Sequence, residues 1–194
     1  MPNRIGAVIR AFVVLALAGT TSSTAARAQP SDTVTPLAQC RMQDLPRTAF
    51  ADAATSASAP PAGEPPIGDI RVDAPTTSLR LYVAKTPLQR ELGLMCVIRM
   101  EPHNGMIFVF EHTSTQEFWM KNTLIPLDMV FVRGDGIVTT VAADVPRSAV
   151  GTPDDAVARR RGTGRFVLEL NAGEAARDGI RAGTRLRLPP LHAQ

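Results

Sequence analysis

The sequence has few of the residues from which catalytic and metal-binding sites are commonly built. Its 194 residues include three His and two Cys, and these show no spacing typical of a zinc site. The sequence Gly134-Asp135-Gly136 is not followed by a helix start, which excludes a phosphate-binding loop there. The apolar run at residues 11–18 is too short for a membrane-spanning helix. We therefore expect no metal, no cofactor and no stable membrane span.

The first 28 residues have the three parts of a secretory signal peptide. Arg4 and Arg10 precede the short apolar run, and Ala26-Arg27-Ala28 is the small-x-small pattern of a cleavage site. We expect cleavage between Ala28 and Gln29 and a mature protein that is periplasmic or secreted. The removed segment carries three Arg and no acid, so cleavage removes the whole formal charge of +3. A neutral mature chain gives no support for nucleic-acid binding.

Residues 29–66 form a leader of low complexity. Its part from Ala51 to Pro66 is almost entirely Ala, Ser, Pro and Thr, which bury too little apolar surface to fold alone. The leader contains Cys40, and the other cysteine is Cys96. Because an exported protein enters an oxidising compartment, the even count predicts a Cys40–Cys96 disulfide that ties the leader to the domain. The alternative is two unpaired thiols.

A single globular domain is expected from residue 67 to residue 190. Thr86, Pro87 and Gln89 predict a capped helix start, and Asn171 predicts the cap of a second short helix. Apolar patterning predicts strands at residues 70–72, 79–83, 106–110, 116–120, 127–132, 137–141, 166–170 and 185–188. The order predicts an α+β, mostly β fold: a small, largely antiparallel, partly closed barrel with one or two short helices.

The segment from Asp144 to Gly164 is expected to be a long irregular loop. It contains Arg159-Arg160-Arg161, which is typical of a solvated surface. The loop is either a lid over the face that carries Trp119 or a disordered excursion.

Four motifs occur together in the order and spacing of a known family. They are Gly93-Leu94-Met95 and residues 105–110, 118–128 and 168–173, of which the Phe-Trp-Met-Lys-Asn-Thr-Leu-Ile-Pro-Leu-Asp run is the most specific. From about Ile70 to Leu188 the sequence resembles the bacterial and archaeal family catalogued as domain of unknown function 192. The resemblance implies a small β-rich domain, often exported, and implies no activity and no catalytic residue. Leu92 stands where such proteins often carry Arg.

The candidate binding residues lie between Glu117 and Asp128. Strand periodicity places Glu117, Trp119 and Lys121 on one face, where a Trp between two charges suits the stacking of a ligand ring or sugar. Alternatively, Trp119 covers a barrel end and Lys121 reaches past it to water. Asn122 and Asp128 bracket the next turn, with Lys121 expected to pair with Asp128. These polar residues either satisfy the turn or line a pocket for a carboxylate or hydroxyl group.

Together these features favour an exported, non-enzymatic module that binds an unknown small molecule or envelope component. The alternative is a small envelope enzyme in which Asp128 is a general base assisted by Lys121. A copper site built from the Met residues and Cys96 is the third hypothesis. It is less favoured because Met in apolar runs is ordinary core filler.

Overall fold

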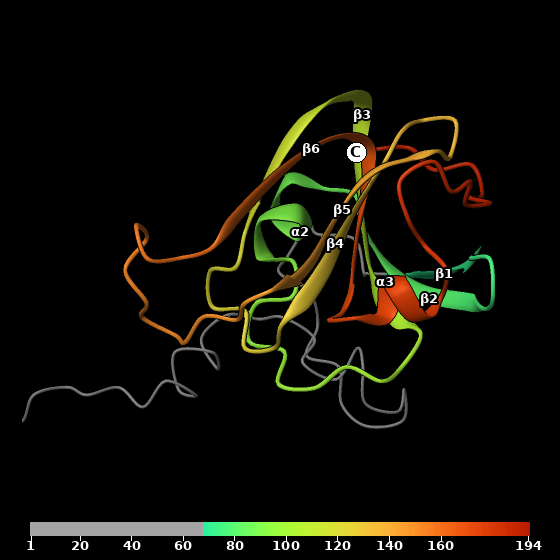
Figure 1. Cartoon of the computed structure of the whole chain (residues 1–194). Coiled ribbons are helices and arrows are strands. Elements are labelled where there is room, and N and C mark those ends of the chain that lie inside the picture. Colours follow the sequence, from blue (N-terminus) through green and yellow to red (C-terminus); the bar gives the residue numbers. More distant parts are fainter. Residues whose placement is uncertain (1–67) are drawn as a thin grey trace, which may run out of the picture. The chain divides into compact units, whose positions relative to one another are not determined.

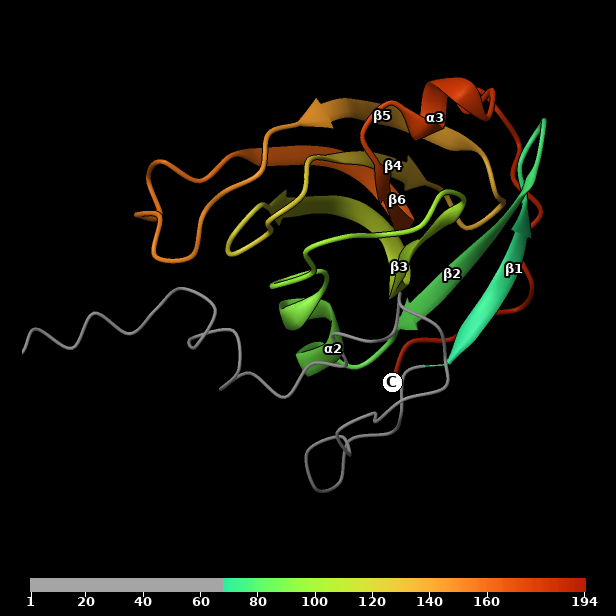
Figure 2. The same cartoon turned by 90° about the horizontal axis from the view of Figure 1, so that it is seen from below.

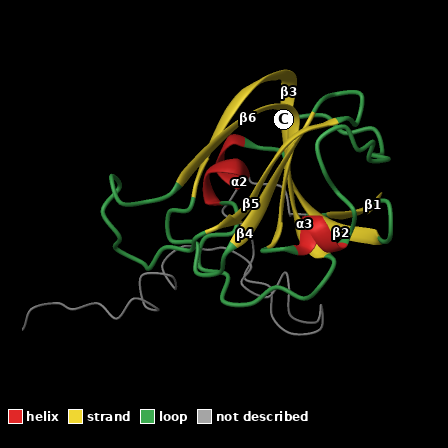
Figure 3. Cartoon of the chain, in the orientation of Figure 1, coloured by secondary structure: helices red, strands yellow, loops and turns green. Residues whose placement is uncertain are grey.

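In the computed structural model the described residues are 68–194 (Figure 1). They form the strands β1 (Asp69–Asp73), β2 (Ser78–Ala84), β3 (Asn104–Trp119), β4 (Leu127–Val132), β5 (Val138–Val145) and β6 (Arg159–Asn171), and the helices α2 (Pro87–Leu92) and α3 (Glu174–Arg177). Strands predominate over the two short helices (Figure 3). None of these helices is long and apolar enough to cross a membrane.

The six strands form one sheet in the order β1-β2-β3-β6-β4-β5. The β2–β3 pair is parallel, with α2 in the crossover, and the other pairs are antiparallel. The sheet arches over α2 (Figure 2). Its hydrogen bonding does not close, but Arg185 and Arg187 bridge to Ile137 and Asp73, beside opposite edges of the sheet. The predicted α+β, mostly β fold is therefore confirmed.

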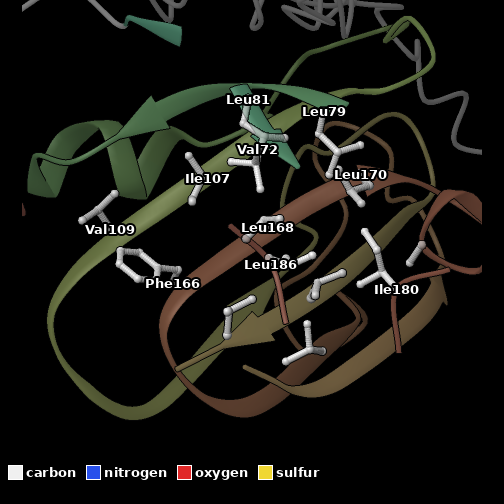
Figure 4. Close-up of a cluster of buried hydrophobic side chains, with 14 of the residues drawn as sticks. Val72, Leu79, Leu81, Ile107, Val109, Phe166, Leu168, Leu170, Ile180 and Leu186 are labelled. Atoms are coloured by element: carbon white, nitrogen blue, oxygen red, sulfur yellow. The ribbon is translucent and has the colours of Figure 1, made fainter. Parts of the chain in front are cut away.

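Both faces of the central strands are buried, which explains their almost unbroken apolar sequences. Alternate residues enter two clusters. The Phe108 cluster includes Met106, Phe108, Met129, Phe131 and Val167. The Ile107 cluster on the opposite face includes Ile107, Val109, Val130, Phe166, Leu168 and Leu170 (Figure 4). Because Glu169 follows Leu168 and precedes Leu170, the strand alternation turns its side chain toward the Phe108 cluster.

The strand pattern differs from the prediction at β3 and β6. Residues 106–110 and 116–120 were expected to be two strands with a loop between them, but β3 runs unbroken from Asn104 to Trp119. Its outer half pairs with residues 159–164, which were expected to belong to a loop, and the register shifts between Val109 and Ser114. Backbone pairing between two long strands thus overrides the polar composition of both segments. Residues 185–188 form bridges and no strand.

The two helix starts differ in whether the capping side chain lies close by in the sequence. At α2 the Thr86 hydroxyl accepts from the Gln89 N–H at 3.2 Å and the Gln89 side chain accepts from the Thr86 N–H at 3.2 Å, which confirms the predicted capping box. At α3 the predicted cap Asn171 is wrong. Gly173 is the N-cap residue, in a left-handed conformation with φ 76°, and it has no side chain that could cap the helix. The capping acceptor is Asp128, which lies on β4.

Candidate ligand pocket

A small pocket opens between the end of α2 and the end of β3. Its apolar lining comes from Leu92, Leu94, Met95, Phe108, Phe118 and Trp119, and its polar lining from Arg90, Glu91, Lys121, Thr123 and Glu169. The pocket has a volume of about 30 Å³. That is room for one or two water molecules or for the end group of a small ligand.

Glu169 is the buried ionisable group of this pocket. It pairs across the sheet with Met106 of β3 and Met129 of β4, and only 5% of its surface is exposed. None of the described residues gives its carboxyl group a hydrogen bond or an ion pair. Burial raises the pKa of Glu169 to about 8. At pH 7 about nine-tenths of this side chain is therefore a neutral carboxylic acid that can donate a hydrogen bond.

Sequence reasoning missed Glu169 as a site residue. The available signal was one acid within Phe166-Val167-Leu168-Glu169-Leu170, a run that is otherwise apolar on both strand faces. An acid at such a position has no solvent-facing side to occupy once both faces are buried. The sequence instead predicts site residues in the segment 117–128, where charges flank the Trp.

Two cations border the pocket, and each is held by groups other than Glu169. Arg90 donates to the carbonyl of Val109 at 3.2 Å, and its guanidinium lies 5.3 Å from the centre of the Phe110 ring. Lys121 donates to the carbonyl of Thr152 at 3.2 Å and forms an ion pair with Asp154. The predicted pairing of Lys121 with Asp128 is therefore wrong, because the 146–158 loop brings Asp154 to Lys121 instead.

Trp119 contributes to the pocket wall with part of its surface. The Arg159 guanidinium lies over its ring at 4.9 Å, and Lys121 Nζ lies 6.0 Å from the ring centre. Glu117 is outside the pocket lining and bonds to Arg159 at 3.3 Å. Its hydrogen bonds to Arg161 and then Arg159 lower the pKa of Glu117. Glu117 thus acts on Trp119 indirectly, by holding Arg159 over the ring.

The loop of residues 146–158 packs against the turn that follows β3. The Ser148 N–H donates to the carbonyl of Thr123 at 2.9 Å, and the Ser148 hydroxyl donates to the carbonyl of Met120. The turn includes Asn122, which has φ 50° and whose carbonyl accepts from the Cys96 N–H at 2.8 Å. The loop and the turn together fix Lys121 and Thr123 at the pocket border.

Asp128 lies apart from the pocket and is fully buried. Its Oδ1 accepts from the N–H groups of Asp144, at 2.8 Å, and Gly173, at 3.0 Å. Its Oδ2 accepts from the N–H of Ala175 at 2.9 Å. The carboxylate therefore joins the irregular end of β5 and the first turn of α3 to β4. This arrangement matches the structural role for Asp128.

One group in the described part of the chain has the composition of a metal site. His103 Nδ1 lies 3.3 Å from Asp178 Oδ2 and 3.8 Å from Glu174 Oε1, and the three ligand atoms all lie within 4.8 Å of one another. The Glu174 carboxylate already accepts from the backbone N–H groups of His103 and Asn171. These bonds hold the start of β3 and the end of β6 against α3.

The remaining sequence-based predictions concern the cysteines, the Met residues and the cleavage site, and those that fall before residue 68 lie outside the described residues. Cys96 is disulfide-bonded and packs with Met95 against Trp119, so it offers no thiolate for copper. Met95, Met100, Met106, Met120 and Met129 are all buried core residues. Cys40, Ala28 and Gln29 lie outside the described residues, so the Cys40–Cys96 pairing and the cleavage site stay predictions.

Comparison with known proteins places this geometry in a family. The DUF192 family model, described as uncharacterized ACR, matches residues 70–188. A crystal structure from Sinorhizobium meliloti 1021, described provisionally as a transcription regulator, is 38% identical; the match covers 64% of this chain and 97% of that one, with a TM-score of 0.55. A protein of unknown function from Novosphingobium aromaticivorans DSM 12444 is 29% identical over 70% of this chain and 94% of that one, with a TM-score of 0.53. No curated protein matches.

Proposed function

This chain belongs to the DUF192 family, and we propose that its domain is an exported, non-enzymatic module that binds a small ligand in the pocket around Glu169. The observation that carries the proposal is the buried carboxyl group of Glu169, which has no bonding partner among the described residues. Burying a polar group in this way costs on the order of 1–3 kcal/mol. A ligand that bonds to Glu169 would offset that cost.

The lining favours binding over catalysis. Its polar side chains include no His, Cys or Ser, and the Thr123 hydroxyl is used to donate to the carbonyl of Lys121 at 3.2 Å. The alternative general base, Asp128, has its carboxylate occupied by three backbone donors outside the pocket. A nucleophile paired with a base, the usual requirement for covalent catalysis, is thus missing from this lining.

The S. meliloti protein is described provisionally as a transcription regulator, and we do not propose that role for this chain. Removal of the first 28 residues would leave a chain without formal net charge. Nucleic-acid binding draws most of its affinity from an excess of Lys and Arg. A small molecule in the pocket is the partner that the side chains of this domain suit better.

The export part of the proposal rests on the signal-like N-terminus and on the bonded state of Cys96. A disulfide is typical of an oxidising compartment. Intact-mass analysis of protein recovered from the periplasm is expected to show a chain that begins at Gln29 and takes up no alkylating agent before reduction. Recovery of the uncleaved chain in the cytoplasm would contradict export, and two alkylated thiols would contradict the disulfide.

The ligand pocket can be tested with its own fluorophore, since Trp119 is the single Trp of the chain. We expect at least one member of a panel of small organic acids, alcohols, sugars and amines to change the Trp119 emission saturably. Glu169→Leu keeps a buried side chain of similar size without the polar group, and it is expected to weaken binding about tenfold or more.

Glu111→Gln is the matched control, because Glu111 lies on the same long strand β3 as part of the pocket but is exposed. This variant is expected to bind like the parent. If no compound in the panel changes the emission, or if Glu169→Leu binds as tightly as the parent, the proposed pocket is not a ligand site.

A further inference from the structure

The charges around Glu169 restrict which chemical group can bond to it. Arg90 and Glu91 reach the pocket from α2, and Lys121 reaches it from the turn after β3. Strand β3 contributes Phe108, Phe118 and Trp119 to the lining, and these side chains add no charge. The pocket therefore has two cations and one anion besides Glu169, and the anion, Glu91, is exposed to solvent.

The two cations are less exposed than Glu91 and can act on a bound group. Lys121 has 25% of its side chain exposed, whereas its ion-pair partner Asp154 is 63% exposed and well screened by water. Arg90 donates to backbone carbonyls, and no carboxylate among residues 68–194 forms an ion pair with it. A positively charged ligand group would be repelled by both cations, whereas a negative group would be attracted.

We propose that the pocket receives the carboxylate group of a small organic acid. The neutral Glu169 side chain donates a hydrogen bond to this carboxylate, and Lys121 and Arg90 balance its negative charge. This inference rests on the proposed function. A carboxylic acid beside a carboxylate forms a short, strong hydrogen bond because one partner is ionised. The pocket volume of about 30 Å³ suits a carboxylate end group, with the rest of the molecule at the mouth beside Leu92 and Trp119.

The pH dependence of affinity separates the three classes of ligand. Once Glu169 has lost its proton, two carboxylates would face each other, so an organic acid would be repelled. An alcohol can still donate to an ionised Glu169 and would lose little affinity. An ammonium group would bind more tightly to the ionised form. With the Glu169 pKa at about 8, the affinity for an organic acid is expected to fall about tenfold between pH 7 and pH 9.

The experiment compares propionate, 1-propanol and propylammonium, which are similar in size and differ in the polar group. Their binding is measured by Trp119 fluorescence at constant ionic strength from pH 6 to pH 9.5. We expect propionate to bind most tightly and to lose about tenfold in affinity between pH 7 and pH 9. Glu169→Gln, whose amide keeps a hydrogen-bond donor and does not titrate, is expected to bind propionate with no such loss.

The other outcomes separate this inference from the proposed function. If 1-propanol or propylammonium binds more tightly than propionate, or if the affinity for propionate does not fall with pH, the pocket binds ligands but the organic-acid class is wrong. The same holds if Glu169→Gln keeps the pH dependence of the parent. If none of the three probes and no compound of the wider panel binds, the proposed function fails together with the inference.

Discussion

Replacing Asp128 with Asn is expected to lower the free energy of unfolding by about 3 kcal/mol. The fully buried carboxylate accepts three backbone hydrogen bonds, from Asp144, Gly173 and Ala175. In the Asn variant an NH₂ group replaces one of the two oxygens and faces a backbone donor. One buried N–H then loses its acceptor, and the remaining bonds lose the contribution of the negative charge.

Chemical denaturation of the variant and the parent at pH 7 measures this difference. Asp155→Asn is the control, because Asp155 is exposed, and its stability is expected to stay within about 0.5 kcal/mol of the parent. An Asp128→Asn variant as stable as the parent would show that the three bonds do not hold α3 and β5 to β4. Such a result would reopen the hypothesis that Asp128 is a general base.

Asp128 also shows where sequence reasoning stops. The start of α2 was predictable because Thr86, Pro87 and Gln89 lie within four residues and cap one another. The start of α3 was not, because its acceptor is 45 residues away from Gly173 in the sequence. The same limit applies to β3, whose outer half is a strand only because residues 159–164 pair with it. Contacts over such distances leave no local pattern.

The candidate site was predictable in part for the same reason. Trp119 and Lys121 lie next to each other on the border of the pocket, as the strand periodicity indicated. Glu117 and Asp128 serve other contacts, with Arg159 and with α3. Glu169 was missed because it comes from β6, some 50 residues beyond Trp119, and a charged residue in an apolar strand does not reveal which cavity it faces.

The parent protein is expected to lose about 3.5 kcal/mol of stability between pH 5 and pH 8 through Glu169 alone. The pKa of this carboxyl group rises from 4.5, its ordinary value, to about 8 in the folded state because of burial. As the pH rises between these values, the unfolded chain loses the proton while the folded chain keeps it, which favours unfolding. The stability contribution is thus complete below pH 4.5 and is lost as the pH approaches 8.

Glu169→Gln isolates this effect, because its side chain is similar in size and does not titrate. Urea denaturation gives the free energy of unfolding of each protein at pH 5 and at pH 8. The loss of stability between these pH values is expected to be about 3.5 kcal/mol smaller in the variant than in the parent. Glu111→Gln removes an exposed acid from β3 and is expected to keep the pH dependence of the parent. Equal pH dependence in the parent and in Glu169→Gln would mean that Glu169 titrates as an exposed acid does.

The titration of the Glu169 carboxyl carbon, followed by ¹³C NMR, tests the central claim most directly. The claim is that this side chain is a buried, neutral acid that faces the ligand pocket. Comparison with Glu169→Gln assigns the resonance. A midpoint at about pH 8 is the result that the structure leads us to expect. A midpoint near 4.5, the ordinary value for Glu, would contradict the buried acid and the pocket chemistry proposed from it.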